Sequence, residues 1–331
     1  MIKIGIIGAG NIANKFSEAV NNSHLVDGEL YAVGSRSIEK AEIFQKQHNI
    51  KKAYGSYEEL YEDKEVDLIY IATPHVFHYE QMMDALDYDK NILCEKPFTI
   101  NAKLAEKVFK KAKDKKVFIM EAMWTRFLPV IQEVKNEIDN GIIGQIELLE
   151  ADFCFNPDNS IEHRLYQPKL GGGALLDVGI YPITFANIYM GEPEKIESNV
   201  KMYKTNVDAS EKIEYKYNNG KAILRAAINE ERPLLATIKG SNGKVVIKGL
   251  HETESAKFYD KDEKLIKHIV IPHDTNGFEY EIKEAIDCIK DGKLESDVVS
   301  HKVTLSVLKQ MDQIRDSWNF KYPQEKWYFT I

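Results

Sequence analysis

The sequence lacks the features that mark several classes of protein. Only three of its 331 residues are cysteines, Cys94, Cys154 and Cys288, and they are far apart in the chain. No apolar run approaches the ~18 residues that a membrane helix needs. The formal net charge of −8 argues against a nucleic-acid partner, because such proteins usually present a basic face. The start "MIKIGIIGAG" has no leader pattern. We therefore expect a reduced, cytoplasmic protein with no membrane or nucleic-acid partner.

The sequence contains two different patterns of apolar residues, which predict two domains. Its hydrophobic content of 44% is that of a globular protein, and its length exceeds the usual limit for one core. Up to about Trp124, buried-strand runs such as "VDLIYIATP" alternate with helical segments, which predicts a doubly wound parallel sheet of the α/β class. Later runs joined by "NNG" and "SNG" predict an α+β domain with a large, mostly antiparallel open sheet. The predicted domains are residues 1–123 and 124–331.

A glycine-rich turn after the first predicted strand indicates a dinucleotide site. "GIIGAGNIAN" places Gly8, Gly10 and Ala13 in the spacing G-x-G-x-x-A. Gly8 would form the tight turn, Gly10 would let a pyrophosphate approach the backbone, and Ala13 would pack the helix on the strand. The helix would begin at Asn11 and Ile12, whose backbone N–H groups face the phosphates. The strand–turn–helix context makes this motif far more specific than the glycine spacing alone.

The end of the second strand predicts NADP over NAD. An acid at this point would bind the ribose 2′-hydroxyl of NAD, but the chain has Ser35-Arg36-Ser37. Arg36 could pair with a 2′-phosphate, and the two serine hydroxyls could add donors. The alternative is that Arg36 is a solvated loop residue and both cofactors are accepted.

Further residues follow the ends of later strands, where ligands of open α/β sheets bind. "CEKP" places Glu95, Lys96 and Pro97 there, and a lysine offers a cation with an adjustable pKa. The alternative is a solvent-facing lysine before a turn proline. "ATPHVFH" places Thr73, Pro74 and His75 beside the cofactor in the same way. His75 and His78 have a spacing that a metal could use, but no further ligands are evident, so no metal is expected.

These motifs, in this order, resemble the Gfo/Idh/MocA oxidoreductase family over nearly the whole chain. The resemblance implies a Rossmann domain followed by an open-sheet domain, NAD or NADP as cofactor, sugars or polyols as substrates, and a catalytic Lys96 before an often cis Pro97. "GGGALLDVGIYP" and "MEAMWTRFLP" resemble the branch with dihydrodiol and NADP-dependent D-xylose dehydrogenases. Many family members have histidine where this chain has Tyr181. The resemblance also implies at least a homodimer through the open sheet.

A mechanism for hydride transfer follows from three residues. Asp177 and Tyr181 are four residues apart, so they would share one face of a helix. Tyrosine is a poor base at its ordinary pKa of about 10, and the Lys96 cation would lower that pKa. Tyr181 would then exchange a proton with the substrate oxygen, while Asp177 would orient either the lysine or a substrate hydroxyl.

The substrate pocket and two other functions remain open at this point. Phe155 and His163 are candidates for pocket walls, and Arg126 for binding substrate oxygen. Trp124 and Phe127 could face the active site or fill the interdomain core. The glycines Gly171 to Gly173 are predicted to be a flexible start of the helix. The alternative functions are an NAD-dependent, redox-assisted glycosidase and a non-catalytic sensor that only binds NADP.

Overall fold

The computed structural model describes residues 1–157 and 160–326, which divide into two compact units. The first unit is Met1–Trp124 with His273–Leu305, and the second is Thr125–Pro272 with the residues from Ser306 on. The segment His273–Leu305 falls in the predicted range 124–331, yet the Ile119 N–H donates to the Leu294 carbonyl at 3.1 Å within the first unit. None of the described helices is long and apolar enough to cross a membrane.

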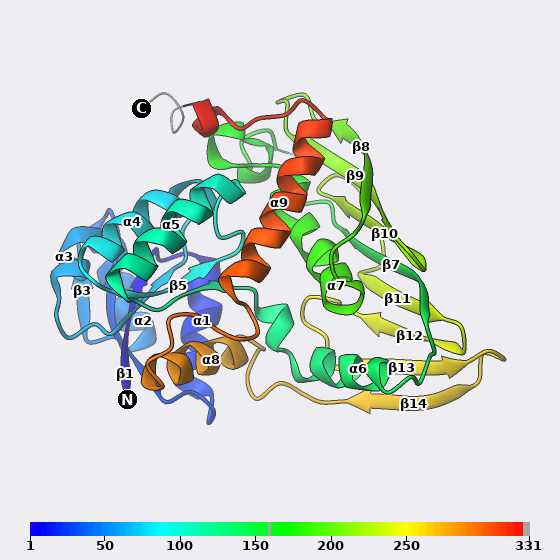
Figure 1. Ribbon diagram of the computed structural model, residues 1–331. Helices are drawn as coiled ribbons and strands as arrows, with labels where there is room; N and C mark the ends of the chain where they lie inside the picture. Colours follow the sequence, from blue (N-terminus) through cyan, green and yellow to red (C-terminus); the bar gives the residue numbers. More distant parts are fainter. Residues whose placement is uncertain (158–159, 327–331) are drawn as a thin grey trace. The chain divides into compact units, whose positions relative to one another are not determined.

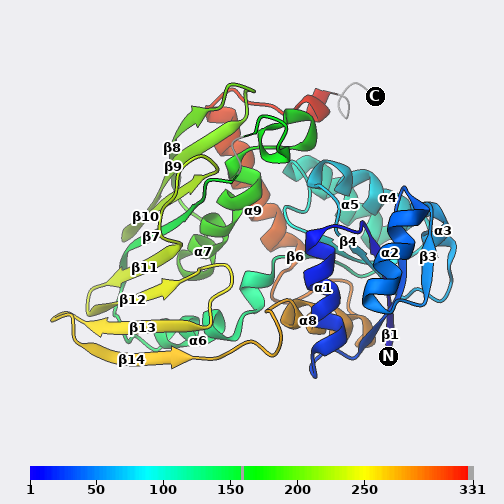
Figure 2. The same ribbon diagram turned by 180° about the vertical axis from the view of Figure 1, so that it is seen from behind.

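The first unit is built on a parallel six-stranded sheet with the order β3-β2-β1-β4-β5-β6. Helices α1 and α2 cover one face, and α4 and α5 cover the other (Figures 1 and 2). The strands are β1 Ile2–Ile7, β2 Gly28–Gly34, β3 Lys52–Tyr54, β4 Leu68–Ile71, β5 Asn91–Glu95 and β6 Ile119–Ala122. The helices are α1 Asn11–Asn22, α2 Ile38–His48, α3 Tyr57–Glu62, α4 His78–Asp87, α5 Ala102–Lys115 and α8 Glu279–Lys290.

Local sequence explains most of these elements. Every residue of β4 is buried, as expected for a central parallel strand that is covered on both faces. Ser37 caps α2 and Asn101 caps α5 through side-chain oxygens that accept backbone N–H bonds. The sequence pattern did not predict β3 and α3. Here Ser56 and Glu59 form a reciprocal capping box that begins α3.

The second unit is built on an eight-stranded sheet with the order β14-β13-β12-β11-β7-β10-β9-β8. All neighbouring strands are antiparallel except β7 and β10. The two sheets confirm the predicted α/β fold class. The strands are β7 Ile146–Cys154, β8 Lys195–Met202, β9 Asp208–Tyr217, β10 Gly220–Ala227, β11 Leu235–Gly240, β12 Gly243–Lys248, β13 Ser255–Asp260 and β14 Leu265–Val270. The helices are α6 Pro129–Asp139, α7 Ile180–Met190 and α9, which runs from the first unit into the second over His301–Ser317.

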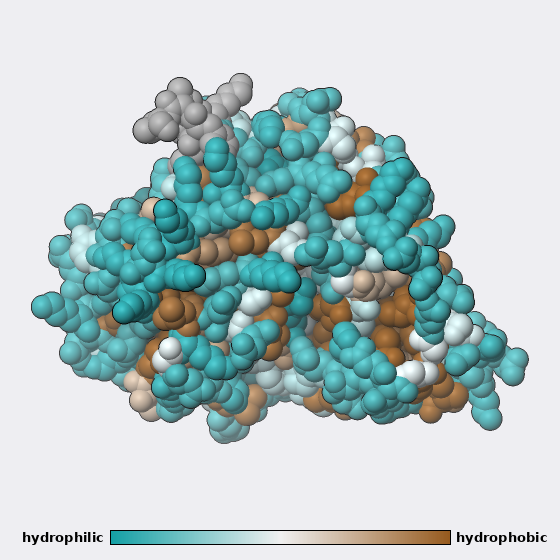
Figure 3. Space-filling view, in the orientation of Figure 1, coloured by the Kyte–Doolittle hydropathy of each residue, from teal (hydrophilic) through white to brown (hydrophobic). Residues whose placement is uncertain are grey.

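Helices cover one face of this second sheet. Helix α7 is buried nearly all round. It lies with α6 on one face of the sheet (Figure 1), which we call the inner face, and the opposite face is the outer face. In both ribbon views no helix of the described residues covers the outer face. Apolar surface is visible over β11 and β12 between α7 and α6 (Figure 3). Helix α7, which comes after Gly171 to Gly173 in the chain, therefore packs on this sheet.

Candidate functional site

The glycine-rich turn after β1 leaves the start of α1 accessible. Gly8 has φ +95°, and a Cβ there would lie 3.2 Å from the Ala72 carbonyl oxygen, so a side chain is disfavoured twice. No atom lies within 4 Å of the Cβ position at Gly10, and no side chain caps α1. Ala13 is fully buried against the sheet. The backbone donors at Asn11 and Ile12 thus remain available, which fits a dinucleotide pyrophosphate.

The polar side chains of the loop after β2 differ in how far they are hydrogen-bonded within the protein. The Ser37 hydroxyl accepts a bond from the Lys40 N–H at 3.3 Å and donates one to Glu39 Oε2 at 2.6 Å. Ser37 therefore has less to offer a ligand than the sequence analysis expected. Arg36 is exposed, and its guanidinium carbon lies 5.8 Å from the centre of the Phe77 ring. Arg36 is the cation of this loop, with one planar face supported by an aromatic ring.

A buried histidine ties the loops that follow β4 and β5. His78 Nε2 lies 2.8 Å from the Thr73 carbonyl oxygen, and Nδ1 lies 3.1 Å from that of Pro97. Burial lowers the pKa of His78 to about 4, while the hydrogen bonds to the Thr73 and Pro97 carbonyls oppose that fall. The Thr73 hydroxyl donates to Gln81 at 2.6 Å, while Pro74 precedes a short 3₁₀ turn that begins at the buried His75. The described residues contain no cluster of three or more metal-ligating side chains.

Lys96 follows directly on a buried acid. The Lys96–Pro97 peptide bond is cis, as the family resemblance implied. The Lys96 N–H donates to Glu95 Oε2 at 3.2 Å, and the Tyr70 hydroxyl donates to Glu95 Oε1 at 2.5 Å. Burial raises the pKa of Glu95 to about 7, while the Lys96 cation opposes that rise. The Glu95 carboxylate, predicted to contact cofactor, thus accepts hydrogen bonds from groups of the first unit itself.

Two more acids lie near Glu95. Glu121 accepts bonds from the Phe98 N–H and the Thr304 hydroxyl, both at 2.9 Å. Glu281 on α8 is fully buried, and neither of its carboxylate oxygens has a partner among the described residues. Burial, and then the charges of Glu95 and Glu121, raise the pKa of Glu281 well above its ordinary range. Burial therefore disfavours the charged form of Glu281, a feature that the sequence did not reveal.

In the second unit, the segment before α7 is a π-helical turn, Leu175–Gly179, and not the expected α-helix. The Ile180 N–H reaches back to the Leu175 carbonyl, and Pro182 has no N–H with which to continue a regular ladder. Asp177 in this turn pairs with Arg164, with Nη2 2.8 Å from Oδ1. The sequence analysis singled out neither Arg164 nor this pairing. Such π turns recur at functional sites.

Tyr181 lies in an aromatic cluster one turn further on. It is 6% exposed, and its ring centre lies 5.3 Å from that of Phe153 and 5.5 Å from that of His251. Phe155, a predicted pocket wall, joins this cluster through Phe153 at 6.2 Å. The Thr125 hydroxyl donates to the His251 carbonyl at 3.2 Å. Because His251 is distant in sequence, only the structure places it beside Tyr181.

The three glycines before the π turn allow very close packing. A Cβ at Gly172 would lie 2.4 Å from the Leu165 carbonyl oxygen, and one at Gly173 would lie 2.2 Å from Asp208 Oδ1. Asp208 Oδ2 accepts the Leu175 N–H at 2.6 Å, which caps the start of the turn. Burial raises the pKa of Asp208 to about 7. These glycines are required by contacts, so the expectation of a merely flexible start was incomplete.

The other predicted substrate residues are more dispersed. Trp124 belongs to the first unit, where its ring lies 4.7 Å from Phe278. Arg126 and Phe127 are partly exposed at the start of the second unit. His163 caps a 3₁₀ turn, and its Nδ1 accepts the Leu165 N–H at 3.4 Å.

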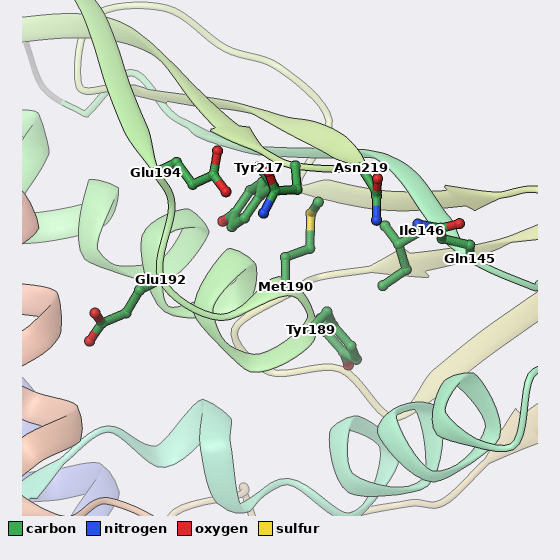
Figure 4. A pocket seen from close by; sticks show the side chains of 9 residues that line it. Gln145, Ile146, Tyr189, Met190, Glu192, Glu194, Tyr217 and Asn219 are labelled. Carbon is green, nitrogen blue, oxygen red and sulfur yellow. The ribbon is translucent and has the colours of Figure 1, made fainter.

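A separate pocket of about 390 Å³ is found beside the end of α7 (Figure 4). None of the predicted site residues lines it. Its walls come from α7 and the neighbouring β7–β10 region, and are formed by Gln145, Ile146, Tyr189, Met190, Glu192, Glu194, Tyr217, Asn218 and Asn219. These side chains include no cation, so we do not assign the hydride chemistry to this pocket.

Comparisons with solved structures support the two-unit architecture. A 3-ketoreductase from Actinomadura kijaniata, in complex with NADP and TDP-benzene, has a TM-score of 0.85 at 24% identity, covering 95% of this chain and 97% of that chain. Levoglucosan dehydrogenase, in complex with NADH and levoglucosan, has a TM-score of 0.86 at 18% identity, covering 98% and 100%. At these identities the likeness shows the fold.

Sequence comparisons show the family. Residues 2–123 match "Oxidoreductase family, NAD-binding Rossmann fold", and residues 131–246 match "GFO/IDH/MocA C-terminal domain". Trans-1,2-dihydrobenzene-1,2-diol dehydrogenase of Xenopus tropicalis is 33% identical, covering 97% of this chain and 99% of the relative. The scyllo-inositol 2-dehydrogenase (NADP(+)) of Bacillus subtilis (strain 168) is 31% identical, covering 98% and 100%. D-xylose 1-dehydrogenase (NADP(+)) of Hypocrea jecorina is 31% identical, covering 98% and 93%. On these matches the chain belongs to the Gfo/Idh/MocA family of oxidoreductases.

Proposed function

We propose that the protein is an NADP-dependent oxidoreductase that acts on a sugar, a diol or a related carbonyl compound. The observation that carries the proposal is the uncapped start of α1 after Gly8 and Gly10, with open space beside Gly10. This geometry suits the pyrophosphate of a dinucleotide. Relatives of full length are named for oxidation of a dihydrodiol, an inositol and xylose, which supports a polyhydroxylated substrate.

Arg36 supports NADP as the preferred cofactor, with NAD as a weaker one. Its exposed guanidinium can pair with a 2′-phosphate, and two of the relatives carry NADP(+) in their names. Glu39 opposes this preference, because the Ser37 hydroxyl holds its carboxylate beside the loop, in the first turn of α2. The cofactor choice therefore depends on Arg36 more than on the serines.

The proposed chemistry gives a separate task to each of three residues. NADP⁺ held by the Gly8–Ala13 turn and Arg36 would supply a hydride acceptor, so that the hydride would leave the carbinol carbon with the electron pair of its C–H bond. Tyr181 takes the proton of the substrate hydroxyl as the carbonyl forms, and returns it in the reverse direction. Lys96 stabilises the phenolate by its positive charge. Asp177 supports the substrate side of this site.

The remaining predicted residues are proposed as contacts that shape the two binding regions. Thr73, Pro74, His75, Glu95 and Pro97 would shape the cofactor side. The substrate side would be formed by Trp124, Arg126, Phe127, Phe155 and His163.

Mutation of Tyr181 tests this proposal. Tyr181→Phe and Lys96→Ala should bind NADP normally but lower kcat by a factor of about 100 or more, the range of general acid–base catalysis. Tyr189→Phe is a matched control, because Tyr189 lies on the same helix and its hydroxyl donates to the Ile131 carbonyl at 3.3 Å. Full turnover by Tyr181→Phe on every alcohol in a panel of pentoses, hexoses and cyclic diols would remove Tyr181 from the mechanism.

We also propose that the cytoplasmic protein is at least a homodimer through the outer face of the second sheet. This face includes partly exposed apolar side chains such as Ile223 and Val246 beside the Arg225–Asp152 ion pair. A sheet face of this size is normally covered in proteins. Light scattering of purified protein at low salt measures the mass, and a monomer would contradict the proposal.

A further inference from the structure

The Arg164–Asp177 ion pair is buried at one end and exposed at the other. The Asp177 side chain is 12% exposed and that of Arg164 is 46% exposed, with 2.8 Å between Nη2 and Oδ1. In the Arg232–Glu230 pair of the same unit, the side chains are 45% and 39% exposed. Both arginines are thus equally accessible, but only Arg164 is anchored on a carboxylate that the protein has largely removed from water. Ion pairs between fully accessible groups hold a side chain weakly.

The backbone around Arg164 is fixed from both sides. Leu165 and Tyr166 are buried, and the Tyr166 hydroxyl donates to the Ile228 carbonyl at 2.6 Å. The Gly173 N–H donates to the Leu165 carbonyl at 2.9 Å. The absence of a side chain at Gly172 lets the glycine segment pass directly beside this carbonyl. Arg164 therefore projects from a rigid point, which lowers the conformational entropy lost when it binds a ligand.

The guanidinium of this pair offers hydrogen-bond donors to a ligand. A guanidinium has several N–H donors in a planar fork, and one bond to Asp177 leaves others at its exposed end. The Asp177 carboxylate balances the charge of the guanidinium from its buried side. The pair is neutral overall, so it suits a neutral ligand whose hydroxyl oxygen accepts from the guanidinium. Asp177 also precedes Tyr181, the proposed proton-exchanging residue, by one turn of the helical segment.

We propose that Arg164, positioned by Asp177, binds the hydroxyl next to the reacting carbon and makes the enzyme selective for neutral vicinal diols, including sugars. This inference rests on the proposed function, because it concerns the alcohol that is oxidised. Arg164 is the residue that contacts the substrate, and Asp177 acts through it. The role of Asp177 that the sequence left open is thereby assigned.

The experiment compares substrates that differ by one hydroxyl group. The probes are trans-cyclohexane-1,2-diol against cyclohexanol, and D-xylose against its 2-deoxy analogue, each with NADP⁺ in excess. In Arg164→Gln, kcat/KM for the diol should fall by about 10- to 100-fold, the usual range for loss of a charged hydrogen bond. Most of that fall should be in KM. The value for the mono-alcohol should change by less than about twofold, because it makes no such bond.

Two further variants separate binding from folding. Arg164→Ala with millimolar guanidinium ion should regain part of the lost activity on the diol, which a merely structural defect would not allow. Arg232→Gln removes a guanidinium of equal exposure and should leave the preference for the diol unchanged.

The outcomes distinguish this inference from the proposed function. An unchanged diol preference in Arg164→Gln, or equal losses on diol and mono-alcohol, overturns the inference while alcohol oxidation still stands. If the wild-type protein oxidises neither these probes nor any sugar with NADP⁺ or NAD⁺, the proposed function fails and the inference falls with it.

Discussion

Replacement of Asp208 by asparagine should remove a pH-dependent loss of stability from the second unit. Asp208 is fully buried at the start of β9, and its carboxylate accepts the Leu175 N–H. Burial raises its pKa from the ordinary 3.8 to about 7, while the Leu175 N–H and the Arg315 cation oppose the rise. The asparagine side chain keeps a carbonyl oxygen for the same N–H but cannot ionise. The difference between the two proteins therefore isolates the charge of Asp208.

The sign and size of the effect follow from proton binding. Between pH 3.8 and about 7 the folded protein holds a proton on Asp208 that the unfolded chain has released. Folding stability therefore falls as pH rises through this window, and the loss is complete above it. Over the full window the loss is about 4 kcal/mol at ~1.36 kcal/mol per pH unit. From pH 5 to pH 8 it is about 3 kcal/mol, or roughly 100-fold in the opening equilibrium.

Native-state hydrogen exchange can measure the opening equilibrium of the second unit by itself. A local measurement is needed because a chain of two units need not unfold in one step. Protection of peptides from β9 and α7 should fall roughly 100-fold more in wild type than in Asp208→Asn between pH 5 and pH 8. Asp262→Asn, at an exposed turn of the same unit, should follow wild type. Parallel pH profiles for wild type and Asp208→Asn would refute the reasoning, since Asp208 would then be ionised throughout.

Three other substitutions, one of them with a matched glycine control, test separate parts of the structure. Arg36→Ala should raise KM for NADP at least about tenfold and leave KM for NAD nearly unchanged, because only NADP carries the 2′-phosphate; equal effects on both cofactors in steady-state assays would argue against Arg36. Gly173→Ala should destabilise the second unit by about 2 kcal/mol or more, since φ is +126° and the new Cβ would lie 2.2 Å from Asp208 Oδ1. Gly141→Ala, at φ +86° with nothing within 4 Å, should cost only about 1 kcal/mol in the same thermal unfolding assay. Glu281→Gln should raise Tm more at pH 8 than at pH 5, because the neutral amide replaces an acid whose charged form is disfavoured by burial; greater destabilisation at pH 8 would show that Glu281 is charged and paired.

The parts of the fold that could be predicted are those set by short-range sequence patterns. The run "IKIGIIGAG" gave β1, its glycine turn and the start of α1, because burial on both faces needs a continuous apolar stretch. The hairpin turns gave the β9–β10 and β11–β12 pairs. Strand β13 was not predicted, because "SAKFYD" shows only a short alternation and follows a polar stretch. The place of α8 in the first unit depends on contacts with distant segments, and no local pattern encodes it.

The candidate site could be predicted only where a motif is contiguous. Lys96 and Tyr181 could be proposed because each stands in a recognisable stretch. Arg164, His251 and Asp208 could not, because each meets its neighbour only in the folded chain and no short motif contains both partners. The π turn was missed for a different reason. Helical periodicity shows which face is apolar, but it does not show that Pro182 interrupts the backbone ladder.

Two acids around the π turn have opposite surroundings, and this difference separates their roles. Asp208 is fully buried and accepts the Leu175 N–H at the start of the turn, so its contribution is to position the backbone. Asp177 is paired with a half-exposed guanidinium, so protonating it would break that ion pair. A carboxylate committed in this way is poorly suited to exchange a proton during each turnover. In the proposed mechanism, this difference fits Tyr181 as the residue that exchanges the proton and Asp177 as the residue that aims Arg164 at the substrate.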